Sequence, residues 1–546
     1  MEKPIMETIK RAAKENLNFF NGNIITLDPR QPSAENLIIE DGKIAQLDAP
    51  LPGTGSGAAG TDCIDLRGKT VIPGLADSHV HLLHVGLGLT FASFREAASV
   101  SDMLDGISDG LKDHPRGEIF LGWDFDDNLF REKRLPTMDE LNSVSTETPI
   151  WVNRIGMNAS VFNAKAWEMV PLPPDLPTVG TDSNGKILGF VSGDANWVAL
   201  ARILNVLSDD VRMAAYRAAA AHCASKGVTS VHAMEGCFSP SMIDNSDFAC
   251  RDVPCLIRGQ DDIDMDIAIW YQHIVDYQKD ITRVKAWGLP RIAGDIFMDG
   301  VLGAAMTKGV LRAALFEPYA DAPSSYGDLL FSDEEIETFV ALSRKAGLQF
   351  SAHAVGDRSF SQLMTAYEKA FENTPGDGRY RIEHCILPDR TKFDLAARLG
   401  VVFSMQPAFD YYSGGPDGRY AGRVGPERAH LTNPFRDILD AGCKIVGGSD
   451  SPVNPIDPIF GIHCMVNHHY PAQRVSPMEA LRAFTADAAF SVFEEEKRGT
   501  LTPGKQADLV VLSDDPLTVS PGKIRDIEVE MTLHKGKITY QGQSFK

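Results

Sequence analysis

The sequence predicts an α/β fold in which a (β/α)8 barrel is flanked by a β-sandwich and carries an insertion after its first strand. Three observations support this prediction. Strand-like and helix-like segments alternate over residues 71–490, the pattern of parallel strands joined by helices. Short, turn-rich strands stand at both ends of the chain, over 18–70 and 491–546. About 145 residues separate the first two barrel strands, far more than a strand-to-helix loop needs.

The two chain ends are expected to form one β-sandwich together. Asn21-Gly22 and Asp41-Gly42 stand between apolar runs, which is typical of hairpin turns. The C-terminal segment has similar short strands in ADLVVLSDDP and VEMTLHKGKITYQG. Because each segment alone is too small for a stable sheet, pairing them into one domain is the economical arrangement.

Eight segments between these ends are the expected barrel strands. Helical stretches such as DEEIETFVALSRKAG lie between several of them, and eight parallel strands covered by helices fit a closed barrel. The insertion, about 85–215, has strand-like segments of its own. Because it follows the first strand, we expect it to cover the C-terminal mouth of the barrel as a lid. The expected strands are 71–80, 227–234, 253–259, 294–300, 348–354, 380–385, 401–407 and 444–450.

The composition excludes several classes of protein. The chain has 546 residues and a formal net charge of −21, an acidic balance that argues against nucleic-acid binding. No apolar run reaches the roughly 18 residues that a membrane span needs. The eight cysteines are scattered without paired spacings, which indicates reduced thiols and a cytoplasmic protein. We therefore expect a small-molecule substrate and neither a nucleic-acid nor a membrane partner, and a homodimer is left open.

The stretch VIPGLADSHVHL, residues 71–82, contains the first candidate metal ligands. His79 and His81 are spaced i, i+2 on an extended segment, so their side chains point to the same face of the strand. Two imidazoles a few ångströms apart suit one divalent metal ion. A pair of this kind also occurs by chance where a strand leaves the core, so its meaning depends on further ligands.

Further candidate ligands stand at the ends of later strands. His353 ends the fifth expected strand, His384 ends the sixth and Asp450 ends the eighth. Catalytic residues of barrel enzymes gather at the C-terminal ends of the strands, where these side chains would meet the first histidine pair. A lone histidine in such a position is usually structural, but four histidines and an aspartate at one mouth predict a metal site.

These motifs together resemble the amidohydrolase superfamily, whose members are metal-dependent hydrolases on a TIM barrel. Within it the chain resembles the YtcJ-like branch, amidohydrolase family 3, which includes N-substituted formamide deformylases. The resemblance runs from about residue 18 to the C-terminus. It implies a TIM barrel flanked by a β-sandwich that both termini build.

The resemblance also implies roles for the candidate ligands. His79 and His81 would hold one divalent metal ion. His353 and His384 would hold a second or alternative metal position, which makes one or two ions in all. Asp450 would join the coordination and shuttle protons while a metal-bound hydroxide attacks a carbonyl carbon. Imidazole and carboxylate ligands suit zinc best, with manganese and iron left open.

The fourth strand departs from the family pattern. Family members usually carry there a lysine, carboxylated to bridge two metals, four residues before an Asp-Gly pair. This chain has Asp295 at that position, ahead of Asp299-Gly300. An aspartate has the charge of the carbamate but a shorter arm. We therefore expect Asp295 to contact at most one metal ion, so a mononuclear site becomes plausible.

Three further departures affect the expected pocket. Met157 replaces the histidine of the family's Gly-His pair, Gly193 replaces a glutamate, and Ala305-Met306 replaces an Arg-Thr pair. Together they predict a more apolar substrate pocket. Trp123 matches the family's GWD motif. Trp123 and Met157 are therefore the candidate substrate-binding residues, although Trp123 could equally be a structural aromatic.

The expected activity is hydrolysis of a carbon–nitrogen bond other than a peptide bond, in an N-substituted amide or formamide. Two alternatives stay open: an esterase or lactonase using the same site, and a catalytically silent homologue that keeps the barrel. His468-His469 resembles a metal pair in spelling only, and we expect it on a solvated helix surface. Cys255 is expected to be a buried thiol beside a strand.

Overall fold

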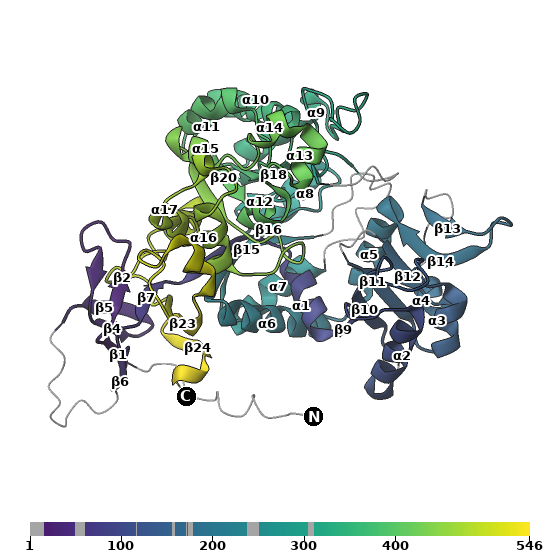
Figure 1. Ribbon diagram of the computed structural model, residues 1–546, viewed down its shortest axis with the longest axis horizontal. Coiled ribbons are helices and arrows are strands. Elements are labelled where there is room, and N and C mark those ends of the chain that lie inside the picture. The colour runs from purple at the N-terminus through teal and green to yellow at the C-terminus, as the bar shows by residue number, and fades with distance from the viewer. Residues whose placement is uncertain are drawn as a thin grey trace.

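An eight-stranded parallel barrel forms the centre of the protein (Figure 1). The structure, a computed structural model, describes residues 16–49, 61–115, 117–155, 159–170, 172, 178–236, 251–303 and 311–545. Strands β8 and β21 close the barrel, because Val80 pairs with Ser451 and the Asp450 N–H donates to the carbonyl of His79 at 2.8 Å. The predicted (β/α)8 fold is thus confirmed. In spatial order the strands are β8 (Leu75–Val80), β15 (Val228–Glu235), β16 (Asp266–Tyr271), β17 (Arg291–Ile292), β18 (Gln349–Ala354), β19 (Arg381–His384), β20 (Val402–Met405) and β21 (Lys444–Gly447).

Two of the eight expected strands were assigned wrongly, and the first, 71–80, was placed to begin too early, because Thr70–Pro73 form the sandwich strand β7. Residues 253–259 form the helix α7 (Asp252–Gly259), which buries Val253 and Leu256, three residues apart, on one face. The third barrel strand is instead β16, residues 266–271. The fourth barrel strand, β17, is Arg291–Ile292 and therefore precedes the expected range 294–300. The backbone turns through Gly294 at a φ of 58°, and within the expected range Phe297 forms an isolated bridge with His353.

Helices cover the outside of the barrel. α9 illustrates why: its Ser332–Glu335 capping box fixes the start, and Ile336, Phe339 and Val340 make one buried stripe. The helices of the barrel are α1 (Leu82–Thr90), α6 (Asp209–Ser225), which precedes β15, α7 (Asp252–Gly259), α8 (Tyr277–Ala286), α9 (Asp333–Lys345), α10 (Asp357–Asn373), α11 (Phe393–Leu399), α12 (Pro407–Ser413), α13 (Arg419–Val424), α14 (Pro426–Ala429), α15 (Phe435–Asp440), α16 (Pro458–Val466), α17 (Pro477–Ala483) and α18 (Ala486–Ser491).

Both chain ends build the flanking β-sandwich, seen beside the barrel where purple and yellow strands meet in Figure 1. Leu17, Val71 and Leu509 belong to one apolar cluster, so residues far apart in sequence share a core. One sheet has the order β5-β4-β1-β6 and the other β24-β23-β22-β7-β2-β3. The strands are β1 (Asn16–Phe20), β2 (Asn23–Ile25), β3 (Ser33–Ala34), β4 (Leu37–Glu40), β5 (Lys43–Leu47), β6 (Thr61–Asp65), β7 (Thr70–Pro73), β22 (Leu509–Leu512), β23 (Val529–His534) and β24 (Lys537–Gln541).

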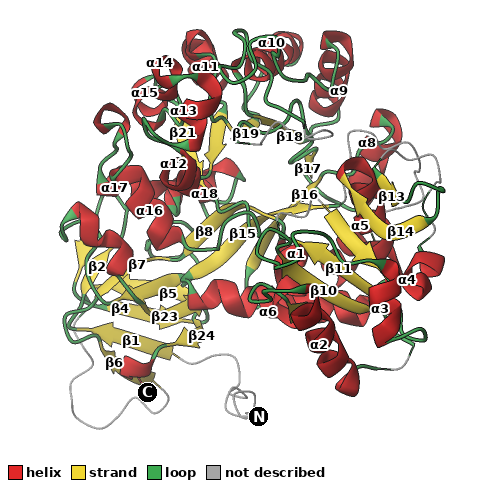
Figure 2. Cartoon of the chain, turned by 45° about the vertical axis from the view of Figure 1, so that its right-hand side comes forward, coloured by secondary structure: helices red, strands yellow, loops and turns green. Residues whose placement is uncertain are grey.

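The insertion forms a module beside the barrel, next to α1 and α6 (Figure 2). Trp151 and Phe162 of the insertion share one continuous apolar cluster with Leu83 of α1. That the insertion covers the mouth as a lid stays a prediction. Its sheet has the order β13-β14-β12-β11-β10-β9. The strands are β9 (Ala92–Ser93), β10 (Phe120–Phe125), β11 (Ile150–Arg154), β12 (Ala159–Phe162), β13 (Val179–Thr181) and β14 (Ile187–Ser192). The helices of the insertion are α2 (Val100–Gly110), α3 (Met138–Val144), α4 (Ala164–Met169) and α5 (Gly193–Val206).

Among the described residues, no helix has both the length and the apolar character needed to cross a membrane.

Candidate metal centre

Four histidines and two aspartates meet at the C-terminal ends of the barrel strands. They come from five strands: the end of β8, the turn after β17, the ends of β18 and β19, and the turn after β21. Except for His81, all of them are buried. The set, called here the His/Asp cluster, consists of His79, His81, Asp295, His353, His384 and Asp450.

The first histidine pair faces Asp450. The Asp450 Oδ1 atom lies 3.4 Å from the His79 Nε2 and 3.2 Å from the His81 Nε2. These three ligand atoms lie within 4.8 Å of one another, close enough to bind one ion. The Asp77 carboxylate supports this arrangement, because it accepts hydrogen bonds from the His79 N–H at 3.2 Å and the Ser449 N–H at 2.9 Å. It thereby ties β8 to the turn that carries Asp450.

Asp295 lies between the two histidine pairs. Its Oδ1 atom is 3.0 Å from the His384 Nε2, 3.6 Å from the His353 Nδ1 and 3.8 Å from the His79 Nε2. Its Oδ2 atom is 3.7 Å from the His81 Nε2. The short Asp295 side chain therefore lies within 4 Å of both histidine pairs, His79/His81 and His353/His384. Its length alone does not predict this. Whether this carboxylate contacts one metal ion or two stays a prediction.

His79, Asp295 and His384 form a second possible ligand group, and this group shares His79 with the first. The His79 Nδ1–H donates to Glu383 at 2.8 Å, so only the Nε2 atom of this ring faces the cluster. One nitrogen lone pair can bind one metal ion. The two groups therefore overlap instead of forming two independent sites.

The outer ring nitrogens of His353 and His384 also form hydrogen bonds. The His353 Nε2–H donates to the carbonyl of Gly300 at 3.3 Å, and the His384 Nδ1–H donates to the Gln406 Oε1 at 2.7 Å. The inner atoms, His79 Nε2 and His353 Nδ1, are buried without a hydrogen-bond partner in the described structure. Buried, unpaired imidazole nitrogens beside two carboxylates fit a divalent metal ion.

Opposite charges dominate the electrostatics of the cluster. Burial alone lowers the pKa of His79, but the carboxylates of Asp295 and Asp450 outweigh burial and hold this pKa well above its usual value. Burial alone raises the pKa of Asp450, but the neighbouring histidines outweigh it and lower this pKa below its usual value. The same balance, with His79, His353 and His384 as partners, lowers the pKa of Asp295 well below normal. Both aspartates are therefore charged at neutral pH.

From the sequence alone, no role is assigned to several residues around the cluster. Glu383 and Gln406 hold ring nitrogens, as described above. Asp299 accepts hydrogen bonds from the N–H groups of Val355 and Gly356 at 3.0 and 2.9 Å, which fixes the turn after β18. The His84 ring centroid lies 5.9 Å from that of His81. In the sequence, only the positions of Glu383 and Gln406 at the ends of expected barrel strands indicate that they lie near the cluster.

The two expected substrate-binding residues have different outcomes. Trp123 lies on β10, is 5% exposed and packs edge-to-face on Trp151 with ring centroids 5.1 Å apart. It is thus part of a packed core, and contact with a substrate stays a prediction. Met157 and the Ala305-Met306 pair lie outside the described residues. Gly193 begins α5 with a φ of 50°, a conformation that glycine adopts without strain.

The expectation for His468-His469 was wrong in part. His468 is fully buried, with its Nε2 atom 3.2 Å from the Asp410 Oδ1. His469 is exposed, and its Nδ1 atom lies 3.0 Å from the same carboxylate. Both rings therefore contact α12 through Asp410, but only His468 is buried, whereas His469 faces solvent as expected. Cys255 is buried as expected, but on helix α7.

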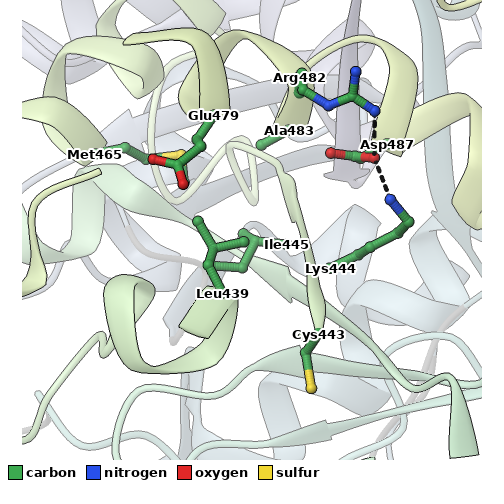
Figure 3. Close-up of a pocket in the computed structure, with 9 residues that line it drawn as sticks. All are labelled: Leu439, Cys443, Lys444, Ile445, Met465, Glu479, Arg482, Ala483 and Asp487. Atoms are coloured by element: carbon green, nitrogen blue, oxygen red, sulfur yellow. Dashed lines mark hydrogen bonds and ion pairs between the residues drawn. The ribbon is translucent and has the colours of Figure 1, made fainter. Parts of the chain in front are cut away.

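A cavity of about 150 Å³ lies away from the cluster (Figure 3). Cys443 and Lys444 line it at the start of β21, whereas Asp450 follows the other end of that strand. Among the lining residues drawn in Figure 3, Asp487 forms ion pairs with Lys444 at 2.7 Å and with Arg482 at 3.4 Å. The cavity is therefore at the opposite end of the barrel from the candidate chemistry.

Comparison with known protein families agrees with this geometry. The model of the amidohydrolase family matches residues 62–540, which is most of the chain. The chain belongs to the amidohydrolase family. Within that family its relatives are of the YtcJ type. The putative amidohydrolase YtcJ of Bacillus subtilis is 26% identical over 95% of this chain and 98% of its own.

Other known proteins are similar to this chain over nearly its full length. The N-substituted formamide deformylase of Arthrobacter pascens is 24% identical and covers 96% of this chain and 98% of its own. Two solved structures are described as uncharacterized metal-dependent hydrolases. The one from Pyrococcus horikoshii is 25% identical, covers 93% of this chain and 99% of its own, and has a TM-score of 0.74. The one from Pyrococcus furiosus is 26% identical, covers 92% and 100%, and has a TM-score of 0.73.

Proposed function

We propose that this amidohydrolase-family protein is a metal-dependent hydrolase of carbon–nitrogen bonds other than peptide bonds, acting on an N-substituted amide or formamide. The observation that carries the proposal is the His/Asp cluster, in which unpaired imidazole nitrogens face two carboxylates. The full-length similarity to an N-substituted formamide deformylase supports the choice of bond.

Each group in the cluster has a chemical role under this proposal. A bound divalent ion would supply an acidified water molecule and polarise an acyl carbonyl. The histidines and Asp295 hold that ion. Asp450, ionised and at the mouth, accepts the proton of the attacking water and returns it to the leaving nitrogen. Returning the proton matters because an amine is a poor leaving group until it is protonated.

We propose zinc as the ion, because neutral imidazoles with carboxylates are typical zinc ligands. We also propose a cytoplasmic location. The six cysteines in the described residues are free thiols, which is expected in a reducing compartment.

A substrate panel tests the proposal. The zinc-reconstituted protein is incubated with matched N-substituted formamides, acetamides, esters and lactones, and amine or alcohol release is measured. We expect turnover of a formamide or amide that depends on added zinc and disappears with chelator. Faster zinc-dependent turnover of esters or lactones would replace the proposed bond with the acyl–oxygen alternative. Stable zinc binding without turnover of any class would support the silent homologue instead.

A further inference from the structure

Glu383 lies directly behind the metal-facing histidine of β8. Its side chain is completely buried, and its Oε2 atom accepts the His79 Nδ1–H at 2.8 Å. Arg381, two residues earlier on β19, donates to both carboxylate oxygens at 2.9 Å. The Ser351 hydroxyl donates to the Oε1 atom from β18. The bidentate ion pair between Arg381 and Glu383 fixes the carboxylate in one orientation.

Arg381 is itself held from several strands. It donates to the His232 Nδ1, the Ser78 carbonyl and the Ser404 hydroxyl, each at 2.7 Å. Its guanidinium also lies over the Trp270 ring, 4.9 Å from the centroid. Strands β8, β15, β16 and β20 therefore all contribute to the position of one guanidinium, and through it to the position of Glu383.

His79 differs from the other described histidines of the cluster in this outer contact. The outer nitrogens of His353 and His384 donate to neutral oxygens, on Gly300 and Gln406. Among these three buried histidines, only His79 has its outer nitrogen within hydrogen-bond distance of a carboxylate, because the His353 Nε2 atom is 3.6 Å from the Asp299 Oδ1. His79 is also the ligand common to both candidate metal groups. A carboxylate behind a metal-binding imidazole fixes its tautomer and makes it a stronger ligand.

We propose that Glu383, held by Arg381, is the positioning residue of the metal centre: it keeps the His79 Nε2 atom facing the cluster and so sets metal affinity at both overlapping ligand groups. Gln406 has the corresponding effect on one group only, the one that contains His384. The proposal rests on the proposed function only in requiring that the cluster binds metal.

The first test is the zinc dissociation constant of purified full-length variants, measured by competition with a chromophoric chelator. Glu383→Gln keeps the shape of the side chain but removes its charge, and we expect affinity to fall about 10- to 100-fold. Ser351→Ala is the matched control. It removes another hydrogen bond to the same carboxylate but leaves the contact with His79, so we expect a change of less than about threefold.

A second variant separates positioning from folding, because Glu383→Gln leaves the buried guanidinium without its counter-charge. Arg381→Met/Glu383→Gln removes both charges, and the melting temperature of its metal-free form shows whether the barrel is intact. We expect this double variant to keep a cooperative fold yet show the same loss of zinc affinity. Wild-type zinc affinity in either Glu383 variant would overturn the proposal. Absence of amide turnover with the expected affinity losses would instead count only against the proposed function.

Discussion

At the scale of single residues, Asp450 and Asp295 share a cluster but contact different partners. Asp450 touches only the first histidine pair, whereas Asp295 lies against both pairs. A proton shuttle must face the attacking water, while a central carboxylate is suited to hold the ion and balance imidazole charge. The two residues should therefore differ in what their loss affects.

Asp450→Asn should reduce turnover while sparing the fold. The amide keeps the size of the side chain but cannot accept a proton, so we expect kcat to fall by about 10²–10⁴ with the identified substrate. Zinc content is measured in the same sample, because one ligand charge is lost. Asp457→Asn, which still caps α16 through Phe460, is the control and should keep wild-type turnover. Equal turnover in Asp450→Asn and wild type would exclude the shuttle role.

His79→Ala should empty the centre. Because both ligand groups use the same His79 Nε2 atom, we expect about one tightly bound zinc ion per chain in the wild type. Elemental analysis after zinc loading and desalting measures the stoichiometry. His469→Ala changes an exposed histidine outside the cluster and should keep the ion. Two tightly bound ions in the wild type, or a retained ion in His79→Ala, would contradict the overlap of the two groups.

At the scale of elements, α1 links the first histidine pair to the outer layer of the barrel. It begins directly after His81 and packs on α6, where a side chain at Gly86 would meet the Ala215 carbonyl at 2.0 Å. Glu235 at the end of β15 accepts the Leu83 N–H at 3.3 Å and the Tyr216 hydroxyl at 3.0 Å. The start of α1 is therefore fixed from two sides.

Gly86→Ala should destabilise the protein through this close contact. The added methyl group meets backbone, which cannot rotate away, so we expect a loss of about 1–3 kcal/mol in the free energy of unfolding. Gly88→Ala is a matched control in the same helix, because nothing lies within 4 Å of its added methyl group. That change should be neutral or stabilising by up to about 1 kcal/mol. Urea unfolding of both variants measures the difference, and equal stability would show that α1 can move off α6.

Elements with local signals were predictable from sequence, and those set by distant contacts were not. His79 and His81 lie in one short motif, and each hairpin turn of the sandwich is indicated by a pair of adjacent residues such as Asp41-Gly42. The third barrel strand was misassigned because VPCLIRG is a short apolar run that suits a strand or a buried helix face equally. The contact of Glu383 with His79 could not be predicted, because the two residues are 304 positions apart in the sequence.

At the scale of the whole molecule, one cluster joins the N-terminal end of the barrel to the sandwich. Asp266 begins β16, and its carboxylate accepts hydrogen bonds from Lys535 and Gln506 at 2.7 Å each. The His534 Nε2 atom lies 3.5 Å away. All three partners belong to the C-terminal part of the chain that builds the sandwich. This carboxylate is therefore one of the polar contacts between the sandwich and the barrel, together with others such as the Thr532 hydroxyl, which donates to the Ala224 carbonyl at 2.7 Å.

Asp266→Asn should weaken that junction in a pH-dependent way. Burial alone raises the pKa of Asp266, but His534, Lys535 and Arg498 outweigh it and lower this pKa below the value of about 3.9 expected in the unfolded chain. A lowered folded-state pKa stabilises the protein above that value and loses its effect as pH falls below it. We therefore expect Asp266→Asn to cost about 2 kcal/mol at pH 7, and this cost to shrink as pH is lowered through about 4.

Asp264→Asn provides the control for this comparison. Asp264 pairs with Lys537 across the same two domains, but both side chains are about half exposed, so the pair should contribute less than about 1 kcal/mol at any pH. Urea unfolding at a series of pH values measures both differences from wild type. A cost for Asp266→Asn that stays constant down to pH 3 would show that shape, not charge, makes this contact. A cost as small as that of Asp264→Asn at pH 7 would show that the Asp266 carboxylate contributes no more to the junction than an exposed ion pair.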